Sequence, residues 1–239
     1  MKIIAIGDIH AKTIWEKIVE KEQDADKILF VGDYFDNLEG ISYPDQIDNF
    51  KKILKLKEND PDKYILLCGN HDLHYLNSIQ EQYSGFNPTF KFDISEVLFP
   101  AIRDRLVQAI YWNSGFLFSH AGLSKTWVRE TLGFDFEPGI PLNTLIIPIN
   151  DFLKYQPQVF GFNGYNPYGD DITQGPLWIR PESLKKDAIE GVTHVVGHTQ
   201  QPKMRIEPGF CFIDTLDRSK EYLSITTDGM NSSLGPKEI

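Results

Sequence analysis

Short apolar runs alternate with segments of helical periodicity over the first third of the chain. The runs at residues 3–6, 27–31 and 64–68 predict buried strands. Residues 13–23 and 45–58 place apolar side chains at helical spacing, which predicts a helix after each of the first two strands. A strand–helix–strand–helix–strand order indicates parallel pairing with right-handed crossovers. The chain therefore begins as an α/β domain.

The later part of the chain has a less regular pattern. Residues 116–119 predict a fourth strand, and residues 192–196, 210–213 and 222–225 predict closing strands, which we expect to be antiparallel and in a second sheet. Residues 124–186 are rich in Gly, Pro, Asn and aromatics, so we expect an insertion that shapes the substrate site. We expect a single domain over residues 1–227 and a frayed tail over residues 228–239.

Composition narrows the class of protein. The 239 residues are 41% hydrophobic, which is enough for a sizeable core and fits one large α/β domain. The net charge of −10 gives no basic footprint, so nucleic acid and anionic membranes are poor candidates for partners. The early Asp8 argues against a signal peptide, and no apolar run could span a bilayer. We therefore expect a cytoplasmic protein in which Cys68 and Cys211 are buried, reduced thiols.

Five short motifs place polar side chains where predicted strands end. The carboxyl ends of parallel strands are where ligands gather in open α/β sheets. Asp8 and His10 are two residues apart, so on an extended segment both point the same way. The motifs offer two Asp, three His and one Asn, a set that suits two divalent first-row metals bridged by a carboxylate. The motifs are Gly7-Asp8-Ile9-His10, Gly32-Asp33-Tyr34-Phe35-Asp36, Gly69-Asn70-His71-Asp72, Ser119-His120-Ala121-Gly122 and Gly197-His198-Thr199.

The order and residues of these motifs resemble those of the calcineurin-like metallophosphoesterases. Within them the chain is most similar to serine/threonine protein phosphatases of bacterial and phage type and to diadenosine tetraphosphate hydrolases. The resemblance covers residues 1 to about 225. It implies a four-layer α/β/β/α sandwich of two mixed sheets flanked by helices. It also implies the metal ligands: Asp8, His10 and Asp33 for one ion, and Asp33, Asn70, His120 and His198 for the other, with Asp33 bridging.

Two further residues are candidates for catalysis. His71 follows ligand Asn70 directly and is the natural general acid, because the leaving alkoxide needs a proton. The resemblance implies that Asp36 orients this imidazole. Asp72 is either a supporting partner of the site or a helix N-cap, and both interpretations stay open.

Phosphate must also be bound, and one segment is a candidate for this. Residues 176–180 resemble a phosphatase segment whose arginine grips phosphate, so Arg180 is a candidate substrate-binding residue together with Asn70. A surface ion pair is the alternative role for Arg180. His74 and His194 match no ligand position and are expected to be structural, as is Asp214. Most aromatic residues in such a chain belong to the core. Those that could instead line a pocket are Tyr34, Phe35, Tyr165, Tyr168 and Trp178.

The chain departs from the family pattern at several positions. Arginines of the family are replaced by Asn37 and Cys68, which weakens the case for phosphate monoesters. Asp72 and Ala121 lean toward the diadenosine tetraphosphate hydrolases. Gln200 stands where some branches have a further histidine, which implies fewer protein ligands for the first ion.

The expected function is hydrolysis of a phosphate ester at a centre of two divalent metal ions. Mn is the metal we expect, with Fe or Zn as alternatives. The first interpretation is a phosphomonoesterase resembling serine/threonine protein phosphatases, acting on a phosphoprotein or a nucleotide. The alternative is a hydrolase of dinucleoside polyphosphates or other nucleotides. A non-catalytic binding protein with this fold would require lost ligands, and all six are present. A nuclease is disfavoured by the acidic charge. The sequence does not determine an oligomeric state.

Overall fold

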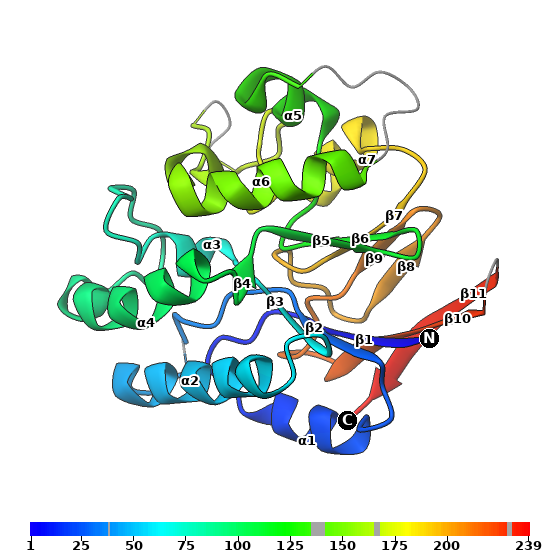
Figure 1. The fold of residues 1–239 in the computed structure, drawn as a ribbon, viewed down its shortest axis with the longest axis horizontal. Helices are drawn as coiled ribbons and strands as arrows, with labels where there is room; N and C mark the ends of the chain where they lie inside the picture. The colour runs from blue at the N-terminus through cyan, green and yellow to red at the C-terminus, as the bar shows by residue number, and fades with distance from the viewer. Residues whose placement is uncertain (38, 135–141, 165–167, 229–230) are drawn as a thin grey trace.

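Two stacked sheets with helices on both outer faces make up the protein (Figure 1). The computed structural model describes residues 1–37, 39–134, 142–164, 168–228 and 231–239. Figure 1 shows α1 and α2 beneath the first sheet and α5, α6 and α7 above the second. The expected α/β/β/α sandwich of two mixed sheets is therefore confirmed.

The first sheet holds the strands predicted near the N-terminus. β1 pairs in parallel with β2, and β2 pairs in parallel with β3. The two crossovers are α1 (Ile14–Lys21) and α2 (Tyr43–Asn59), as the periodicity predicted. In the order β11-β10-β1-β2-β3-β4, the strands are β1 (Lys2–Ile6), β2 (Lys27–Phe30), β3 (Tyr64–Leu67), β4 (Val107–Gln108), β10 (Glu221–Asp228) and β11 (Asn231–Glu238).

Alternation along β1 explains how the first sheet is buried on both faces. Ile3 and Ala5 pack into the core between the sheets, together with Phe118 of the second sheet. Ile4 and Ile6 point the other way, into the core beneath the helices. All four β1 residues have no exposed surface, which is why the strand reads as a continuous apolar run rather than an alternating one.

The second sheet corrects the expected orientation of the closing strands. β7 pairs in parallel with both β6 and β9, because the chain crosses over between them, and only β5 and β8 are antiparallel to their neighbours. The strand predicted at residues 222–225 is β10, which returns to the first sheet and pairs antiparallel with β1. In the order β5-β6-β7-β9-β8, the strands are β5 (Ile110–Asn113), β6 (Phe116–Ser119), β7 (Thr193–Val196), β8 (Arg205–Glu207) and β9 (Phe210–Phe212).

The C-terminal segment also differs from its expectation. Residues 231–238 were expected to fray, but they form β11 and pair with β10 along its whole length, from Asp228↔Asn231 to Glu221↔Glu238. The polar composition was misleading, since an edge strand faces solvent and needs few apolar side chains. Backbone hydrogen bonds to β10 hold it.

The chain between β3 and β7 supplies the remaining helices. Residues 124–186 carry most of those above the second sheet in Figure 1, and their loops reach the cavity described below. None of the helices in the described part of the chain is long and apolar enough to cross a bilayer. The helices are α3 (Asn70–Leu73), η1 (Pro88–Phe90), α4 (Lys91–Arg103), α5 (Lys125–Leu132), α6 (Asn143–Tyr155), η2 (Pro157–Phe160) and α7 (Pro181–Asp187).

Candidate metal centre

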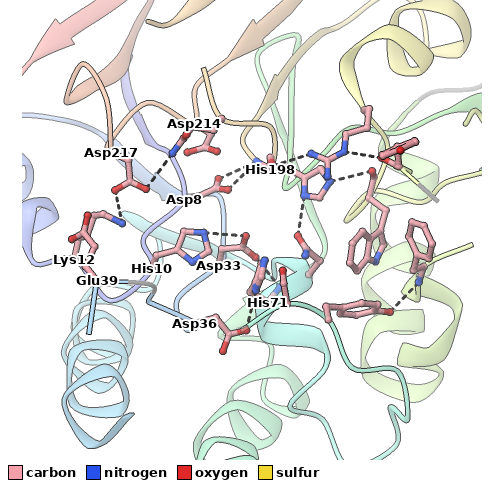
Figure 2. Close-up of a pocket in the computed structure, with 18 residues that line it drawn as sticks. Asp8, His10, Lys12, Asp33, Asp36, Glu39, His71, His198, Asp214 and Asp217 are labelled. Carbon is pink, nitrogen blue, oxygen red and sulfur yellow. Dashed lines mark hydrogen bonds and ion pairs between the residues drawn. The ribbon is translucent and has the colours of Figure 1, made fainter. Parts of the chain in front are cut away.

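A cavity of about 660 Å³ opens at the carboxyl ends of the central strands. Figure 2 shows the candidate residues Asp8, His10, Asp33, His71 and His198 converging on it. The loops after β1, β2 and β7 and the short helix α3 after β3 supply these side chains, and His120 follows β6. All six candidate ligands therefore lie together, although they are spread over 190 positions of the sequence.

Buried carboxylates form the floor of the site. Asp8 and Asp33 are only 3% and 2% exposed. Together with His120, they offer ligand atoms that all lie within 4.8 Å of one another. Within the described residues, no lysine or arginine forms an ion pair with either carboxylate. Two buried anions without a cationic side chain fit a site for metal cations.

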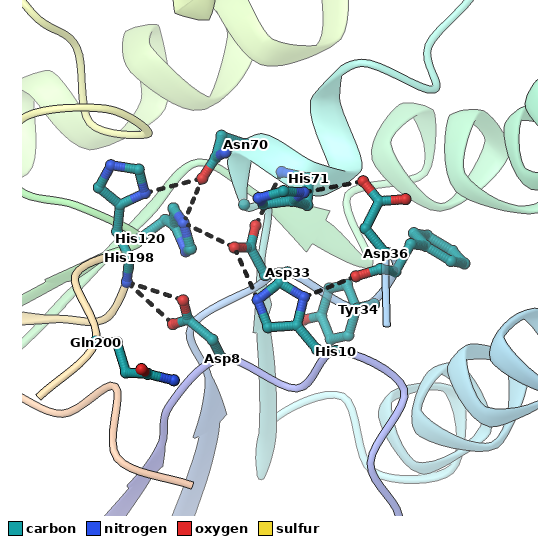
Figure 3. A network of polar contacts seen from close by, with 12 residues as sticks. Asp8, His10, Asp33, Tyr34, Asp36, Asn70, His71, His120, His198 and Gln200 are labelled. Carbon is teal, nitrogen blue, oxygen red and sulfur yellow. Dashed lines mark hydrogen bonds and ion pairs between the residues drawn. The ribbon is translucent and has the colours of Figure 1, made fainter. Parts of the chain in front are cut away.

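Each candidate histidine uses one ring nitrogen for support and keeps the other for the centre (Figure 3). Nδ1 of His10 lies 2.9 Å from the carbonyl of Phe35, and Nδ1 of His120 lies 2.8 Å from that of Val31. If each Nδ1 donates its hydrogen to these carbonyls, Nε2 carries no hydrogen and can bind a metal. Nε2 lies 3.6 Å from Asp33 Oδ2 in His10 and 3.4 Å from it in His120. Backbone acceptors that fix the tautomer in this way are typical of metal-binding histidines.

His198 presents the opposite nitrogen and meets the same cluster. Its Nε2 lies 3.1 Å from the carbonyl of Trp178, while its Nδ1 lies 2.9 Å from Asn70 Oδ1. Nε2 of His120 is also 2.9 Å from Asn70 Oδ1. The amide oxygen of Asn70 therefore faces both imidazoles, as a shared centre of neutral oxygen and nitrogen ligands requires.

Electrostatics at the centre favour a bound cation. Burial, Asp214 and Asp33 raise the pKa of Asp8 well above its usual range. Burial alone would also raise the pKa of Asp33, but the nearby His120, His71 and His10 lower it below its usual value. A positive charge placed between the two carboxylates would keep both ionised, because it removes their mutual repulsion.

Several of these residues have left-handed backbone conformations. The φ angles are 40° at His10, 53° at Asp33, 62° at Asp36 and 60° at His198. His10 and Ala11 form a turn that the Lys12 N–H closes by donating to the carbonyl of Ile9 at 2.9 Å, so the backbone is not extended at His10 as the sequence suggested. Positive φ in residues other than glycine costs free energy, and such strain gathers at functional sites.

Two glycines allow the strand ends to approach the carboxylates. A Cβ at Gly69 would lie 2.1 Å from Asp33 Oδ1, and one at Gly197 would lie 2.0 Å from Asp8 Oδ1. Any side chain there would push the carboxylates out of place. The glycine that precedes Asn70 and the glycine that precedes His198 are thus required by packing at the site.

His71 and Asp36 form a pair at the edge of the centre. Nδ1 of His71 lies 2.9 Å from Asp36 Oδ2, which leaves Nε2 as the unpaired nitrogen of the ring. Burial lowers the pKa of His71, but Asp33, the hydrogen bond to Asp36 and the Asp36 charge raise it to about 9. The protonated imidazole is therefore favoured at neutral pH, which a proton donor requires.

Sequence reasoning missed how His74 and Tyr75 bear on this pair. Nε2 of His74 lies 2.7 Å from Asp36 Oδ2, and the hydroxyl of Tyr75 donates to Asp36 Oδ1. Both side chains are fully buried, so they fix the carboxylate that contacts His71. The His-x-x-His spacing of residues 71 and 74 could have revealed this, because residues three apart share a helix face.

Asp72 is a supporting partner of the site, whereas the N-cap of α3 is Gly69, and Asp72 lies at the third helical position of the capping box. Its Oδ2 accepts hydrogen bonds from the backbone N–H groups of Gly69, at 2.7 Å, and Asp33, at 2.9 Å. Its Oδ1 accepts from the N–H of Tyr34 at 2.7 Å. The buried carboxylate thus caps the start of α3 and ties it to the loop that carries Asp33.

Two cationic side chains, Arg180 and Lys12, line the cavity. Arg180 donates from Nη1 to Thr199 Oγ1 at 3.1 Å and from Nε to the carbonyl of Tyr168 at 3.3 Å. Lys12 forms an ion pair with Asp217 at 2.6 Å. Arg180 therefore lines the cavity beside His198, where a phosphoryl oxygen could reach it.

The departures from the family pattern have local explanations. Asn37 donates to the carbonyl of His10 at 2.6 Å, so it stabilises the loop and brings no charge. Cys68 is fully buried, and both cysteines are free thiols, as expected. Gln200 lines the cavity and hydrogen bonds with Asp217 at 3.4 Å. None of these three residues supplies a cation.

The other residues considered from sequence fall into two groups. Tyr34 and Phe35 are fully buried in the core, whereas Tyr168 and Trp178 line the cavity, and Tyr165 lies outside the described residues. His194 is also buried, with Nε2 2.9 Å from the carbonyl of Ile189.

Asp214, which was expected to be structural, also lines the cavity. It is 7% exposed, and burial, Asp33 and Asp217 raise its pKa to about 7. The carboxyl of Asp214 is therefore only partly ionised near neutral pH, because burial and the neighbouring carboxylates disfavour its charged form.

Comparisons with known proteins find one family model and structures of phosphatases that are similar to this chain. The family model for calcineurin-like phosphoesterases matches residues 1–202. A protein-tyrosine phosphatase of the psychrophile Shewanella sp. is similar in structure, with a TM-score of 0.57, 15% identity and coverage of 98% of this chain and 77% of that one. A serine/threonine phosphatase from Saccharomyces cerevisiae, with similarity to human PP5, has a TM-score of 0.58, 15% identity and coverage of 100% and 80%. At these identities the two structures support the fold alone. A search of curated proteins finds no significant match.

Proposed function

The chain belongs to the calcineurin-like phosphoesterase family, and from this premise we propose that it is a phosphomonoesterase with a dinuclear metal centre, similar in action to serine/threonine protein phosphatases. The observation that carries the proposal is the convergence of six oxygen and imidazole ligands beside the His71–Asp36 pair. Asp8, His10 and Asp33 would hold one ion, and Asp33, Asn70, His120 and His198 the other. Mn is the metal we expect, with Fe or Zn as alternatives.

Side chains of the protein donate the proton to the leaving group and position the substrate. The chemistry that two divalent ions supply in such centres is activation of water and neutralisation of phosphoryl charge. His71 donates the proton on Nε2 to the leaving oxygen as the phosphorus–oxygen bond breaks, while Asp36 holds Nδ1. Arg180 binds a non-bridging phosphoryl oxygen from the side of His198.

A panel of substrates tests the proposal against its alternative. Mn-loaded protein should hydrolyse a phosphopeptide faster than a dinucleoside tetraphosphate, a phosphodiester or single-stranded DNA. A phosphoprotein and a mononucleotide are both candidates for the phosphorylated substrate. A higher rate on the dinucleoside tetraphosphate would replace the phosphomonoesterase with a dinucleoside polyphosphate hydrolase. A chain that hydrolyses neither these four substrates nor a mononucleotide would contradict an enzymatic function.

Arg180→Ala should lower kcat/KM for a phosphate monoester by about 10–150-fold, because a charge-assisted contact to a phosphoryl oxygen is lost. Metal content should stay at the wild-type value, since no ligand is removed. Steady-state kinetics and metal analysis on the same preparations measure both quantities. Arg180→Lys should recover only part of the rate, because lysine lacks the two-pronged fork of the guanidinium.

Arg103→Ala is the matched control for this substitution. Arg103 pairs with Asp104 on the surface and is 54% exposed, so its loss should leave kcat/KM unchanged. The loss in Arg180→Ala should be larger for monoesters than for diesters, because a diester has one fewer charged oxygen. A wild-type rate in Arg180→Ala would assign this arginine a purely structural role.

A further inference from the structure

The two sides of the cavity differ in chemistry. Lys12, Glu39 and Asp217 lie together on one side of His10 in Figure 2, and Asp214 lies close to them. The other side carries three aromatic side chains, Tyr83, Phe162 and Trp178, which we call the aromatic wall. A phosphate ester bound at the centre would therefore meet acidic and basic side chains near Lys12, and apolar rings together with the Arg180 guanidinium near His198.

Contacts among its own members hold the aromatic wall in place. The rings of Tyr83 and Trp178 are 4.3 Å apart, and those of Phe162 and Trp178 are 5.1 Å apart, both edge to face. The N–H of Phe162 donates to the hydroxyl of Tyr83 at 3.1 Å. Three segments far apart in sequence thus build one rigid surface, and such preorganisation lowers the entropic cost of binding a ligand.

The aromatic wall begins beside the proton donor. The ring of Tyr83 stacks on His74 at 5.6 Å, and the ring of His74 meets His71 at 5.8 Å. At the far end, Trp178 lies 5.7 Å from the ring of His198. The wall therefore spans the side between His71 and His198. A group that takes a proton from His71 would therefore have the aromatic wall within reach.

We propose that the aromatic wall binds an aromatic ring carried by the leaving group of the phosphate ester. The inference rests on the proposed phosphatase function and narrows its substrates. Aromatic pairs prefer edge-to-face or offset-stacked contacts at 4.5–7 Å, which a flat ring beside these side chains can make. A short aliphatic group such as serine would leave much of the apolar surface in contact with water.

Two sources could supply the ring, and the wall's position suits both. The phenol of phosphotyrosine places the ring directly on the ester oxygen, whereas a nucleotide places its base beyond the sugar. In either case the phosphorus–oxygen bond breaks, water supplies the new oxygen on phosphorus, and His71 protonates the aromatic product at the ester oxygen. The shared requirement is an aromatic ring on the departing alcohol.

Binding to the wild-type protein provides the first test. Phenylphosphonate and methylphosphonate are not hydrolysed, and they differ only in the ring. Titration calorimetry on Mn-loaded protein should give a dissociation constant at least about 3–10-fold lower for phenylphosphonate. Equal constants would overturn the proposal even if phosphatase activity is found. A preference for phenylphosphonate without any hydrolysis would contradict the proposed function and leave the aromatic subsite standing.

Variants of the wall provide the second test. Tyr83→Leu and Phe162→Leu keep an apolar side chain but remove the ring. Each should lower the ratio of kcat/KM for an aromatic substrate to kcat/KM for a phosphoserine peptide by about 3–10-fold. Tyr83→Phe keeps the ring and should retain the ratio, so it also reports whether folding tolerates change at this position. Phe92→Leu is the control, because Phe92 is 63% exposed on α4 and lies outside the cavity.

The choice of aromatic substrate separates the two sources. A phosphotyrosine peptide and the phosphoserine peptide share one sequence, and adenosine 5′-monophosphate supplies the base. If the leucine variants lower the kcat/KM ratio to the phosphoserine peptide only for the phosphotyrosine peptide, the wall binds a phenolic leaving group. If they lower it only for adenosine 5′-monophosphate, the wall binds a nucleobase. Ratios that stay at the wild-type value for both substrates in both leucine variants would overturn the proposal.

Discussion

Asp33→Ala should remove both metal ions and lower kcat/KM by more than about 10³-fold. Loss of a residue that only hydrogen-bonds to a metal ligand costs less, about 10–100-fold. Asp33 Oδ2 faces both His10 and His120, so the carboxylate is placed to serve both ions. Metal analysis after dialysis should find two ions per chain in the wild type and almost none in the variant. His120→Ala should lose only one ion.

A thermal measurement separates lost metal from lost folding. Mn²⁺ should raise the Tm of the wild type, because a ligand that binds only the folded state stabilises it by mass action. The Tm of Asp33→Ala should not respond to Mn²⁺. Asp48→Ala is the control, since Asp48 is 71% exposed and its loss should alter neither Tm nor metal content. Full metal occupancy in Asp33→Ala would end the bridged dinuclear interpretation.

His71→Asn should lower kcat for phenyl phosphate by about 10²–10⁴-fold while both metals stay bound. The backbone N–H of residue 71 still donates to Asp33 Oδ1 at 2.9 Å, so the substitution leaves the ligand loop in place. Nitrophenyl phosphate should lose much less activity, because nitrophenolate departs without a proton. Both substrates carry a ring, so the aromatic wall affects them alike.

Two further variants define the role of this imidazole. Asp36→Asn should show the same dependence on the leaving group, but more weakly, since it loosens His71 without removing it. His194→Asn replaces a buried histidine outside the cavity and should affect the two aryl phosphates equally. An equal loss on both substrates in His71→Asn would argue against proton donation.

Much of the fold followed from local pattern. The first three strands and their two helices appear where periodicity predicted them, because each pattern reports which face of one element is buried. The candidate ligands were also readable, since each follows an apolar strand and sits beside a glycine or a small residue. Parallel strands bring their carboxyl ends to one edge, so Asp8, Asp33 and Asn70 had to lie close together.

Tertiary structure decided what depends on contacts between distant segments. No local pattern distinguishes a strand of the first sheet from one of the second, so the place of β10 in the first sheet emerged only from its pairing with β1, and β11 only from its pairing with β10. His74 lies outside the five motifs, and although its spacing from His71 suggests a shared face, the fold decides that it meets Asp36.

The sequence by itself thus indicated the candidate ligands and determined the order of the first elements, because those signals lie within a few residues of one another. The aromatic wall needed the structure, because Tyr83, Phe162 and Trp178 come from three loops without periodicity. The left-handed turns at Asp33 and His198 needed it too, since only packing against neighbouring strands compensates their strain. Burial of one face is encoded locally, whereas the meeting of loops is set by the packing of the whole chain.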